Sequence, residues 1–64
     1  MKVNGQITTL SETTSLENFL KAKNYNLLRI AVELNGEIVP KGKFDSVVLS
    51  DADCLEIVSF VGGG

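Results

Sequence analysis

The last strand-like segment, residues 54–61, most constrains how this chain can fold. It is apolar at nearly every position, and three glycines, Gly62, Gly63 and Gly64, follow it directly. A strand with apolar residues on both of its faces is usually covered by other parts of the protein on at least one face. We therefore expect this segment to be a central strand of a sheet, with the glycines projecting from its end.

The three glycines have no side chain to bury, and ordering them costs more backbone entropy than ordering any other residue type. Either they are inert, or a partner requires a thin backbone with a free carboxylate at its tip. Taken alone, such an end is more often a frayed terminus, but after a central strand in so short a chain a function is favoured. We expect one domain over residues 1–61 and a flexible tail over residues 62–64.

Length and composition exclude several classes of function. A chain of 64 residues forms at most one domain with a small core. Six Lys and Arg residues against eight Asp and Glu residues give a net charge of −2, which argues against a nucleic-acid partner. His is absent and Cys54 is the only cysteine, so no disulfide framework and no Cys/His zinc site is expected. We expect a cytoplasmic protein that does not bind membranes.

Two Asn-Gly pairs mark the tight turns of the expected sheet, because both residue types tolerate a positive φ. Asn4-Gly5 predicts a short N-terminal hairpin. Asn35-Gly36 separates a predicted strand over residues 27–34 from a short returning strand over residues 37–39. The irregular segment that follows is expected to direct four apolar side chains into the core, namely Phe44, Val47, Val48 and Leu49.

One helix is expected over residues 15–23, because apolar residues recur there at helical spacing. Thr14 with Glu17 three residues later fits a capping box, and Ser15 is the competing N-cap. With a single apolar stripe, the helix most simply packs on one face of a single mixed sheet of four to five strands, as in a two-layer α+β domain. The crossing connection is expected to be right-handed and to bring the first and last strands together in parallel.

The last strand presents different side chains to its two faces. Leu55 and Ile57 share one face, whereas Glu56, Val58 and Phe60 share the other. Because one helix covers only one face of a sheet, Val58 and Phe60 are expected to be exposed beside the tail as a docking patch for a partner. In the alternative interpretation, Phe60 is simply a core residue.

No other side chain strongly predicts chemistry. Cys54 could be a reactive thiol, but a small apolar residue at the start of a buried strand is favoured. Asp51 and Asp53 fall in a turn without a third ligand nearby, so solvated carboxylates are favoured over a metal site. Lys41 and Lys43 are expected to be solvated turn charges. We expect no catalytic residue, because His is absent and no nucleophile has a recognisable base. We also expect no bound metal, because no ligand set is evident.

Three stretches carry a family resemblance: Val-Asn-Gly at residues 3–5, Ala-Val-Glu-Leu-Asn-Gly-Glu-Ile-Val-Pro at residues 31–40, and Glu-Ile-Val-Ser-Phe-Val-Gly-Gly-Gly at residues 56–64. Together they resemble the ThiS family, the small sulfur carriers of thiamine biosynthesis, whose fold is the ubiquitin-like β-grasp. The resemblance covers nearly the whole chain. The chain departs from the family pattern at Ala52, where Gly is usual, and at Phe44, where Trp is frequent.

The resemblance implies a carrier that is not an enzyme and binds no cofactor itself. A partner adenylating enzyme, similar to ubiquitin-activating enzymes, would use ATP and Mg to adenylate the Gly64 carboxylate. A cysteine desulfurase or another sulfur donor would then generate a thiocarboxylate, and a thiazole synthase would take the sulfur. Gly62 and Gly63 would thread into the active sites of these partners, and the chain alone would be a monomer.

Two alternatives to this function remain open at the level of sequence. The first is a molybdopterin-type or other ubiquitin-like sulfur carrier. The second is a β-grasp binding module that is not conjugated and whose tail is inert. A small enzyme is a more distant third.

Overall fold

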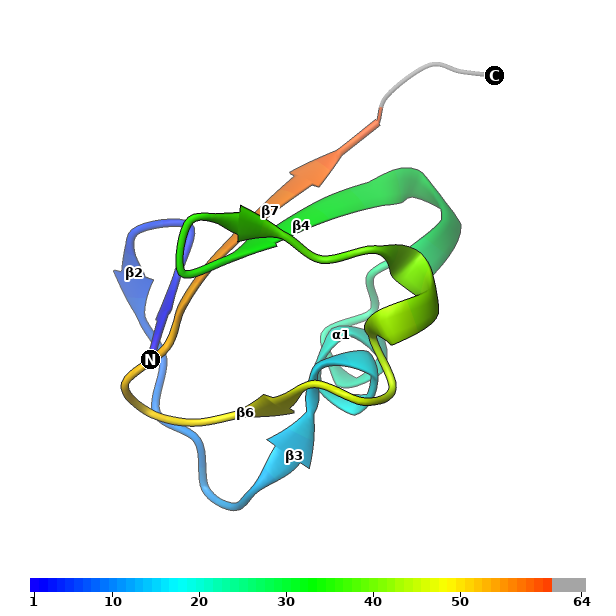
Figure 1. Ribbon diagram of the computed structural model, residues 1–64. Coiled ribbons are helices and arrows are strands. Elements are labelled where there is room, and N and C mark those ends of the chain that lie inside the picture. The colour runs from blue at the N-terminus through cyan, green and yellow to red at the C-terminus, as the bar shows by residue number, and fades with distance from the viewer. Residues whose placement is uncertain (61–64) are drawn as a thin grey trace.

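The computed structural model describes residues 1–60, which form an α+β domain with one α-helix and a mixed five-stranded sheet (Figure 1). The strand order across this sheet is β2-β1-β7-β4-β5, so β7 is central, as the sequence predicts. The five strands are β1 (Lys2–Val3), β2 (Gln6–Ile7), β4 (Ile30–Leu34), β5 (Glu37–Ile38) and β7 (Cys54–Ser59).

Strand β7 holds the two halves of the sheet together. It pairs in parallel with β1, where Val3 lies beside Leu55, and antiparallel with β4, where Val32 lies opposite Ile57. The predicted parallel contact between the first and last strands is therefore confirmed. Asn4 reinforces this junction, because its side-chain Oδ1 accepts a hydrogen bond of 2.7 Å from the backbone N–H of Ile57.

Helix α1 (Leu16–Ala22) is capped by Ser15, the second of the two candidate N-caps. The Ser15 hydroxyl accepts a hydrogen bond of 3.1 Å from the backbone N–H of Asn18, which would otherwise lack a partner in the first turn. Thr14 is not the cap, because its hydroxyl instead donates a hydrogen bond to the Ser15 carbonyl oxygen. After the helix, Asn24 adopts a left-handed φ of 66° that ends the helical path.

A second, two-stranded ladder, which the sequence did not predict, pairs the segment directly before the helix with a later segment of the chain. Strand β3 (Thr14–Ser15) pairs antiparallel with β6 (Val48–Leu49) (Figure 1). Because side chains alternate along a strand, Leu49 is buried and Val48 points outward with 63% of its surface exposed. The expectation that Val48 enters the core is therefore wrong, whereas Phe44 and Leu49 are buried as expected.

The strand predicted over residues 27–34 begins only at Ile30. Its first part is a 3₁₀ turn, η1 (Leu27–Arg29), because the Asn26 side chain accepts a hydrogen bond from the Leu28 backbone N–H and so favours a turn over a ladder. A second 3₁₀ turn, η2 (Lys41–Lys43), follows Pro40.

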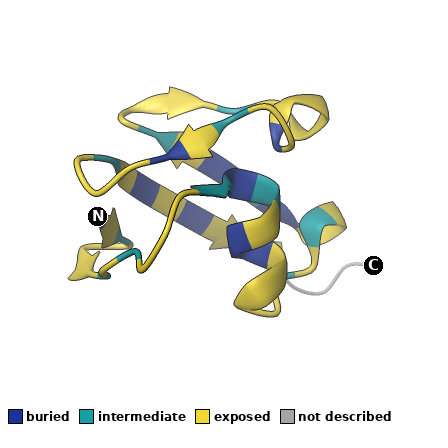
Figure 2. Cartoon of the chain, turned by 90° about the horizontal axis from the view of Figure 1, so that it is seen from below, coloured by how far each residue is buried: buried dark blue, intermediate teal, exposed yellow. Residues whose placement is uncertain are grey.

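The core lies between α1 and one face of the sheet, and Figure 2 shows buried and exposed residues alternating along the central strands. Within residues 1–60, no helix is both long and apolar enough to cross a membrane. The buried side chains are those of Met1, Leu16, Phe19, Leu20, Ile30, Val32, Phe44, Leu49, Leu55 and Ile57.

Candidate functional site

The predicted site residues divide into two groups. Val58 and Phe60 belong to the described part of the chain, at the end of β7. Gly62, Gly63 and Gly64 lie outside the described residues, as does the predicted domain boundary at residue 61. The structure therefore describes the candidate site only as far as Phe60.

Val58 and Phe60 are exposed, with 60% and 55% of their surfaces open to solvent. Leu55 and Ile57, on the other face of the same strand, are buried beneath α1. The prediction that the two faces of β7 differ in this way is confirmed, and Phe60 is not a core residue. Exposed large apolar side chains next to each other are typical of interaction surfaces.

Phe60 is held in place by two segments that are distant in sequence. Its backbone N–H donates a hydrogen bond of 2.7 Å to the carbonyl oxygen of Arg29, at the end of η1. The Lys41 ammonium lies 5.8 Å from the centroid of the Phe60 ring and donates a hydrogen bond of 3.0 Å to the Leu28 carbonyl oxygen. Such a cation–π contact contributes about 0.5–1 kcal/mol at an exposed site.

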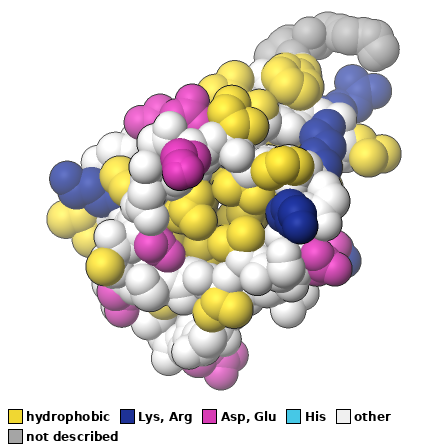
Figure 3. All heavy atoms as spheres, viewed as in Figure 1, with side chains coloured by type: hydrophobic (Ala, Val, Ile, Leu, Met, Phe, Trp, Pro, Cys, Tyr) yellow, Lys and Arg dark blue, Asp and Glu magenta, His cyan; other side chains and the backbone are white. Residues whose placement is uncertain are grey.

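Lys41 is therefore more than the solvated turn charge that we expected. Although exposed, it joins η2 to both η1 and the end of β7. In Figure 3, hydrophobic side chains and Lys and Arg side chains lie close together at the upper right, the end toward which β7 runs in Figure 1. We call the exposed side chains of Val58 and Phe60, with Ala31 opposite Val58 and Lys41 beside Phe60, the docking face.

The same side of the sheet becomes acidic away from Phe60. Glu56 lies directly opposite Glu33 in the pairing of β7 with β4, and both side chains are exposed. Like charges directly opposite one another on neighbouring strands destabilise a sheet. This pair therefore does not help folding, and it leaves two adjacent carboxylates free to attract a cationic group.

Cys54 lies at the start of the central strand β7, as expected, but its side chain is exposed on this face. It has the same parity along β7 as Glu56 and Val58, and this parity points away from the helix. Among residues 1–60, no group of three His, Cys, Asp or Glu side chains is arranged to hold a metal ion.

Asp53 is a structural carboxylate at the turn before β7. Its Oδ1 accepts a hydrogen bond of 3.0 Å from the Asn35 side chain, and its Oδ2 accepts one of 2.9 Å from the Ser50 backbone N–H. These two hydrogen bonds, the Asn35 bond above all, hold the pKa of Asp53 below its ordinary value. The carboxylate therefore links the turn before β7 to the turn after β4.

Three known proteins share the whole length of this chain or nearly so. The sulfur carrier protein ThiS of Bacillus subtilis is 34% identical over 65 residues, covering 100% of this chain and 98% of that protein. The crystal structure of thiamine biosynthesis protein ThiS from Geobacter metallireducens superposes with a TM-score of 0.82 at 35% identity, covering 98% of this chain and 96% of that one. A thiazole synthase of Paramagnetospirillum magneticum contains a stretch 40% identical over 62 residues, which covers 97% of this chain but only 19% of that protein.

The ThiS family model matches residues 1–64. The five-stranded mixed sheet and the single main helix agree with the Geobacter structure at this level of identity. The chain therefore belongs to the ThiS family and has its ubiquitin-like β-grasp fold.

Proposed function

We propose that the chain is a sulfur carrier of thiamine biosynthesis, in which the carboxylate of Gly64 is converted to a thiocarboxylate by partner enzymes. The observation that carries this proposal is membership in the ThiS family over all 64 residues, including the C-terminal glycines. The fold supports it, because the central and best-paired strand of the sheet, β7, leads in sequence directly to Gly62, Gly63 and Gly64.

The proposed chemistry activates a carboxylate that is otherwise a poor electrophile. A Gly64 carboxylate oxygen attacks the α-phosphorus of ATP, held with Mg in an adenylating enzyme, and pyrophosphate leaves. The terminal sulfur of a persulfide formed by a cysteine desulfurase then attacks the acyl carbon, and AMP leaves. Two thiols, such as those of excess cysteine, reduce the resulting acyl disulfide, which breaks its S–S bond and leaves the thiocarboxylate on Gly64. Gly62 and Gly63 suit this route because a backbone without Cβ atoms can enter a narrow channel.

The docking face supplies the surface on which such partners would bind. Val58 and Phe60 form an apolar centre, and aromatic side chains at the centre of an interface often carry much of the binding energy. The Glu33–Glu56 pair lies on the same face and would be relieved of its mutual repulsion by a basic group of the partner. Docking here would fix the base of the tail at the entrance to the partner's active site.

A thiazole synthase is the proposed acceptor of the sulfur. The Paramagnetospirillum thiazole synthase contains a region similar to almost all of this chain. The matched region is 19% of that protein, so the synthase is about five times as long as this chain. A carrier-like region within a synthase supports a functional association between the two. It favours delivery to a thiazole over delivery to a molybdopterin dithiolene.

Intact mass spectrometry tests the proposal. The chain is incubated with an adenylating enzyme of the thiamine pathway, ATP, Mg, a cysteine desulfurase and cysteine, and a matched sample lacks ATP. The expected product is heavier by the difference between sulfur and oxygen, and fragmentation places the change on Gly64. An unchanged mass with an adenylating enzyme that is active on another ThiS protein would contradict the proposal.

A further inference from the structure

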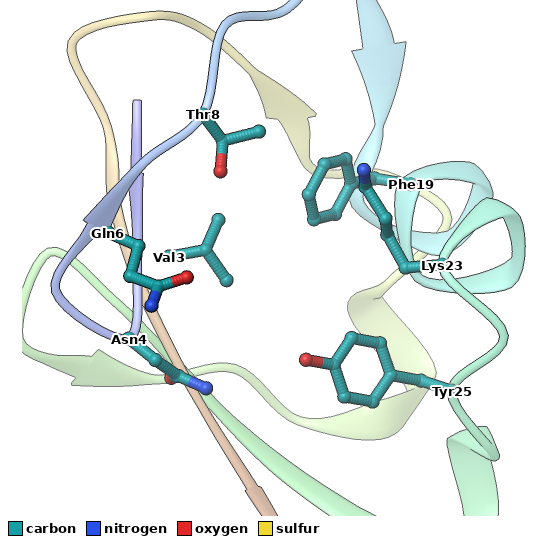
Figure 4. A pocket seen from close by; sticks show the side chains of 7 residues that line it. All are labelled: Val3, Asn4, Gln6, Thr8, Phe19, Lys23 and Tyr25. Carbon is teal, nitrogen blue, oxygen red and sulfur yellow. The ribbon is translucent and has the colours of Figure 1, made fainter.

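A pocket of about 300 Å³ lies between the β1–β2 hairpin and the C-terminal end of α1 (Figure 4). Val3 lies beside the buried Leu55 in the β1–β7 pairing, so the pocket opens on the helix side of the sheet, opposite the docking face. The residues that line it are Val3, Asn4, Gln6, Thr8, Phe19, Lys23 and Tyr25.

Several hydrogen-bonding groups in this pocket have no partner within the described chain. Figure 4 shows the Tyr25 hydroxyl, the Gln6 amide and the Thr8 hydroxyl directed toward the central space. Within residues 1–60, none of these three side chains forms a hydrogen bond with another protein group. Asn4 uses its Oδ1 to accept from Ile57, so its Nδ2 retains two donors for a ligand.

The charge of the pocket opposes that of the whole chain. Lys23 is the only charged side chain among the lining residues of the described chain, and no Asp or Glu lines the pocket, although the net charge of the protein is −2. The Lys23 ammonium lies 5.8 Å from the centroid of the Phe19 ring. One cation surrounded by neutral donors suits a single negative charge and provides too little positive charge for a polyphosphate.

The remaining walls of the pocket are apolar. The Phe19 ring, 6% exposed, lies across from Val3, so the body of a ligand would contact hydrocarbon on two sides. A volume of about 300 Å³ is at the lower end for small-molecule sites. We propose that this pocket binds a small organic monocarboxylate with an apolar body, its carboxylate accepting hydrogen bonds from Lys23 and Tyr25 and its body packing against Phe19 and Val3. This site goes beyond the proposed sulfur-carrier function and does not involve Gly64.

Titration of the ¹⁵N-labelled full chain with benzoate, followed by NMR, tests this site. The expected result is saturable chemical-shift changes confined to the residues that line the pocket. Lys23→Gln should weaken benzoate binding by about tenfold, because a charge-assisted hydrogen bond is lost. Tyr25→Phe keeps the ring but loses the hydroxyl donor, and should weaken benzoate binding several-fold. Benzyl alcohol lacks the carboxylate. It should bind the parent chain about as weakly as benzoate binds the Lys23→Gln variant.

Lys21→Gln is the matched control, because Lys21 lies on the same helix, pairs with Glu17 and does not line the pocket. It should bind benzoate as the parent chain does. The proposal is overturned if benzoate causes no saturable shifts, if Lys21→Gln and Lys23→Gln weaken binding equally, or if benzyl alcohol binds as well as benzoate. A peptide C-terminus is the competing occupant, and N-acetylphenylalanine binding much more tightly than benzoate would overturn the small-molecule assignment in its favour.

Discussion

Adjacent residues of β7 have opposite environments, and this alternation determines what each can do. Leu55 and Ile57 contribute to the core, whereas Val58 and Phe60 present apolar surface to solvent. Exposing apolar surface brings no folding advantage, so these two side chains are expected to matter for binding rather than for stability.

Replacing Val58 or Phe60 by Asp should weaken binding of the adenylating enzyme by about tenfold or more, as truncation at the centre of an interface does. The unfolding free energy should change by about 1 kcal/mol or less, because both side chains are exposed and Phe60 loses only its cation–π contact with Lys41. Val48→Asp is the matched control, since Val48 is 63% exposed on β6, away from the docking face. Titration calorimetry and thermal unfolding report the two quantities. If the Val58, Phe60 and Val48 variants all bind the adenylating enzyme equally well, the proposed docking role of Val58 and Phe60 is contradicted.

Asp53 is expected to make the free energy of unfolding depend on pH in the acidic range. Its hydrogen bonds to Asn35 and Ser50 lower its pKa in the folded state below the ordinary value of 3.8. The unfolded state therefore binds the proton more tightly, and the stabilisation is complete above the unfolded pKa and lost as the pH falls through the folded pKa. Urea unfolding at a series of pH values from neutral to below 3.8 should show this loss.

Asp53→Asn should lower the unfolding free energy at pH 7 by about 1 kcal/mol, because an amide keeps only one of the two acceptor oxygens. The same variant should lose less stability on acidification than the parent chain. Asp45→Asn is the control, because Asp45 is an exposed carboxylate in the loop after η2. An Asp53→Asn chain with the acid dependence of the parent would show that other carboxylates cause it.

The start of helix α1 can be tested as an element. Ser15→Ala removes the acceptor of the Asn18 backbone N–H and should destabilise the chain by about 1 kcal/mol. Thr14→Ala should cost less, because the Thr14 hydroxyl only donates a hydrogen bond of 3.3 Å to the Ser15 carbonyl oxygen. Chemical unfolding of both variants measures the difference. A larger effect at Thr14 would mean that the capping box forms in solution instead.

Elements with a strong local signal were predictable from the sequence. Both turns adopt the expected positive φ, with values of 51° at Asn4 and 52° at Asn35, and β7 is central as its apolarity indicates. The β3–β6 ladder was not predictable, because its two short strands lie far apart in the chain and no Asn-Gly turn joins them, whereas such a turn marks the equally short β1 and β2. The η1 turn was missed because Leu27–Arg29 has the composition of a strand, and the Asn26 cap decides otherwise.

The part of the candidate site that could be predicted from the sequence is the part set by the alternation of side chains along β7. Exposure of Val58 and Phe60 follows from alternation and from the presence of a single helix. The contacts of Lys41 with Phe60 and Leu28 join segments far apart in the chain, and no local pattern encodes them. The pocket beside Tyr25 likewise arises from the placement of the hairpin against the helix.

At the scale of the whole molecule, the sheet separates two kinds of surface. The docking face lies on the side without the helix, whereas the monocarboxylate pocket lies between the hairpin and α1 on the other side. A partner protein and a small ligand could therefore occupy the chain together. In so small a domain, Asn4 contacts both regions, because it lines the pocket and binds the Ile57 backbone N–H next to Val58.

Removal of Gly63 and Gly64 should abolish adenylation of the chain without lowering its stability. The shortened chain should not be adenylated, because its new terminus is two residues short of the position that the partner's ATP site requires. Its melting temperature should stay close to that of the full chain, because glycine has no side chain to bury. Pyrophosphate release with the adenylating enzyme measures the first effect, and differential scanning fluorimetry measures the second.

The informative control for this truncation is a chain of full length in which Gly63 is replaced by Val. It keeps the distance from β7 to the terminal carboxylate but adds a branched Cβ where the channel is expected to be narrow. Loss of adenylation in both variants at an unchanged melting temperature would support a tail that needs both its length and its lack of side chains. A large fall in melting temperature on truncation would instead make the glycines part of the folded domain, contrary to the proposed division at residue 61.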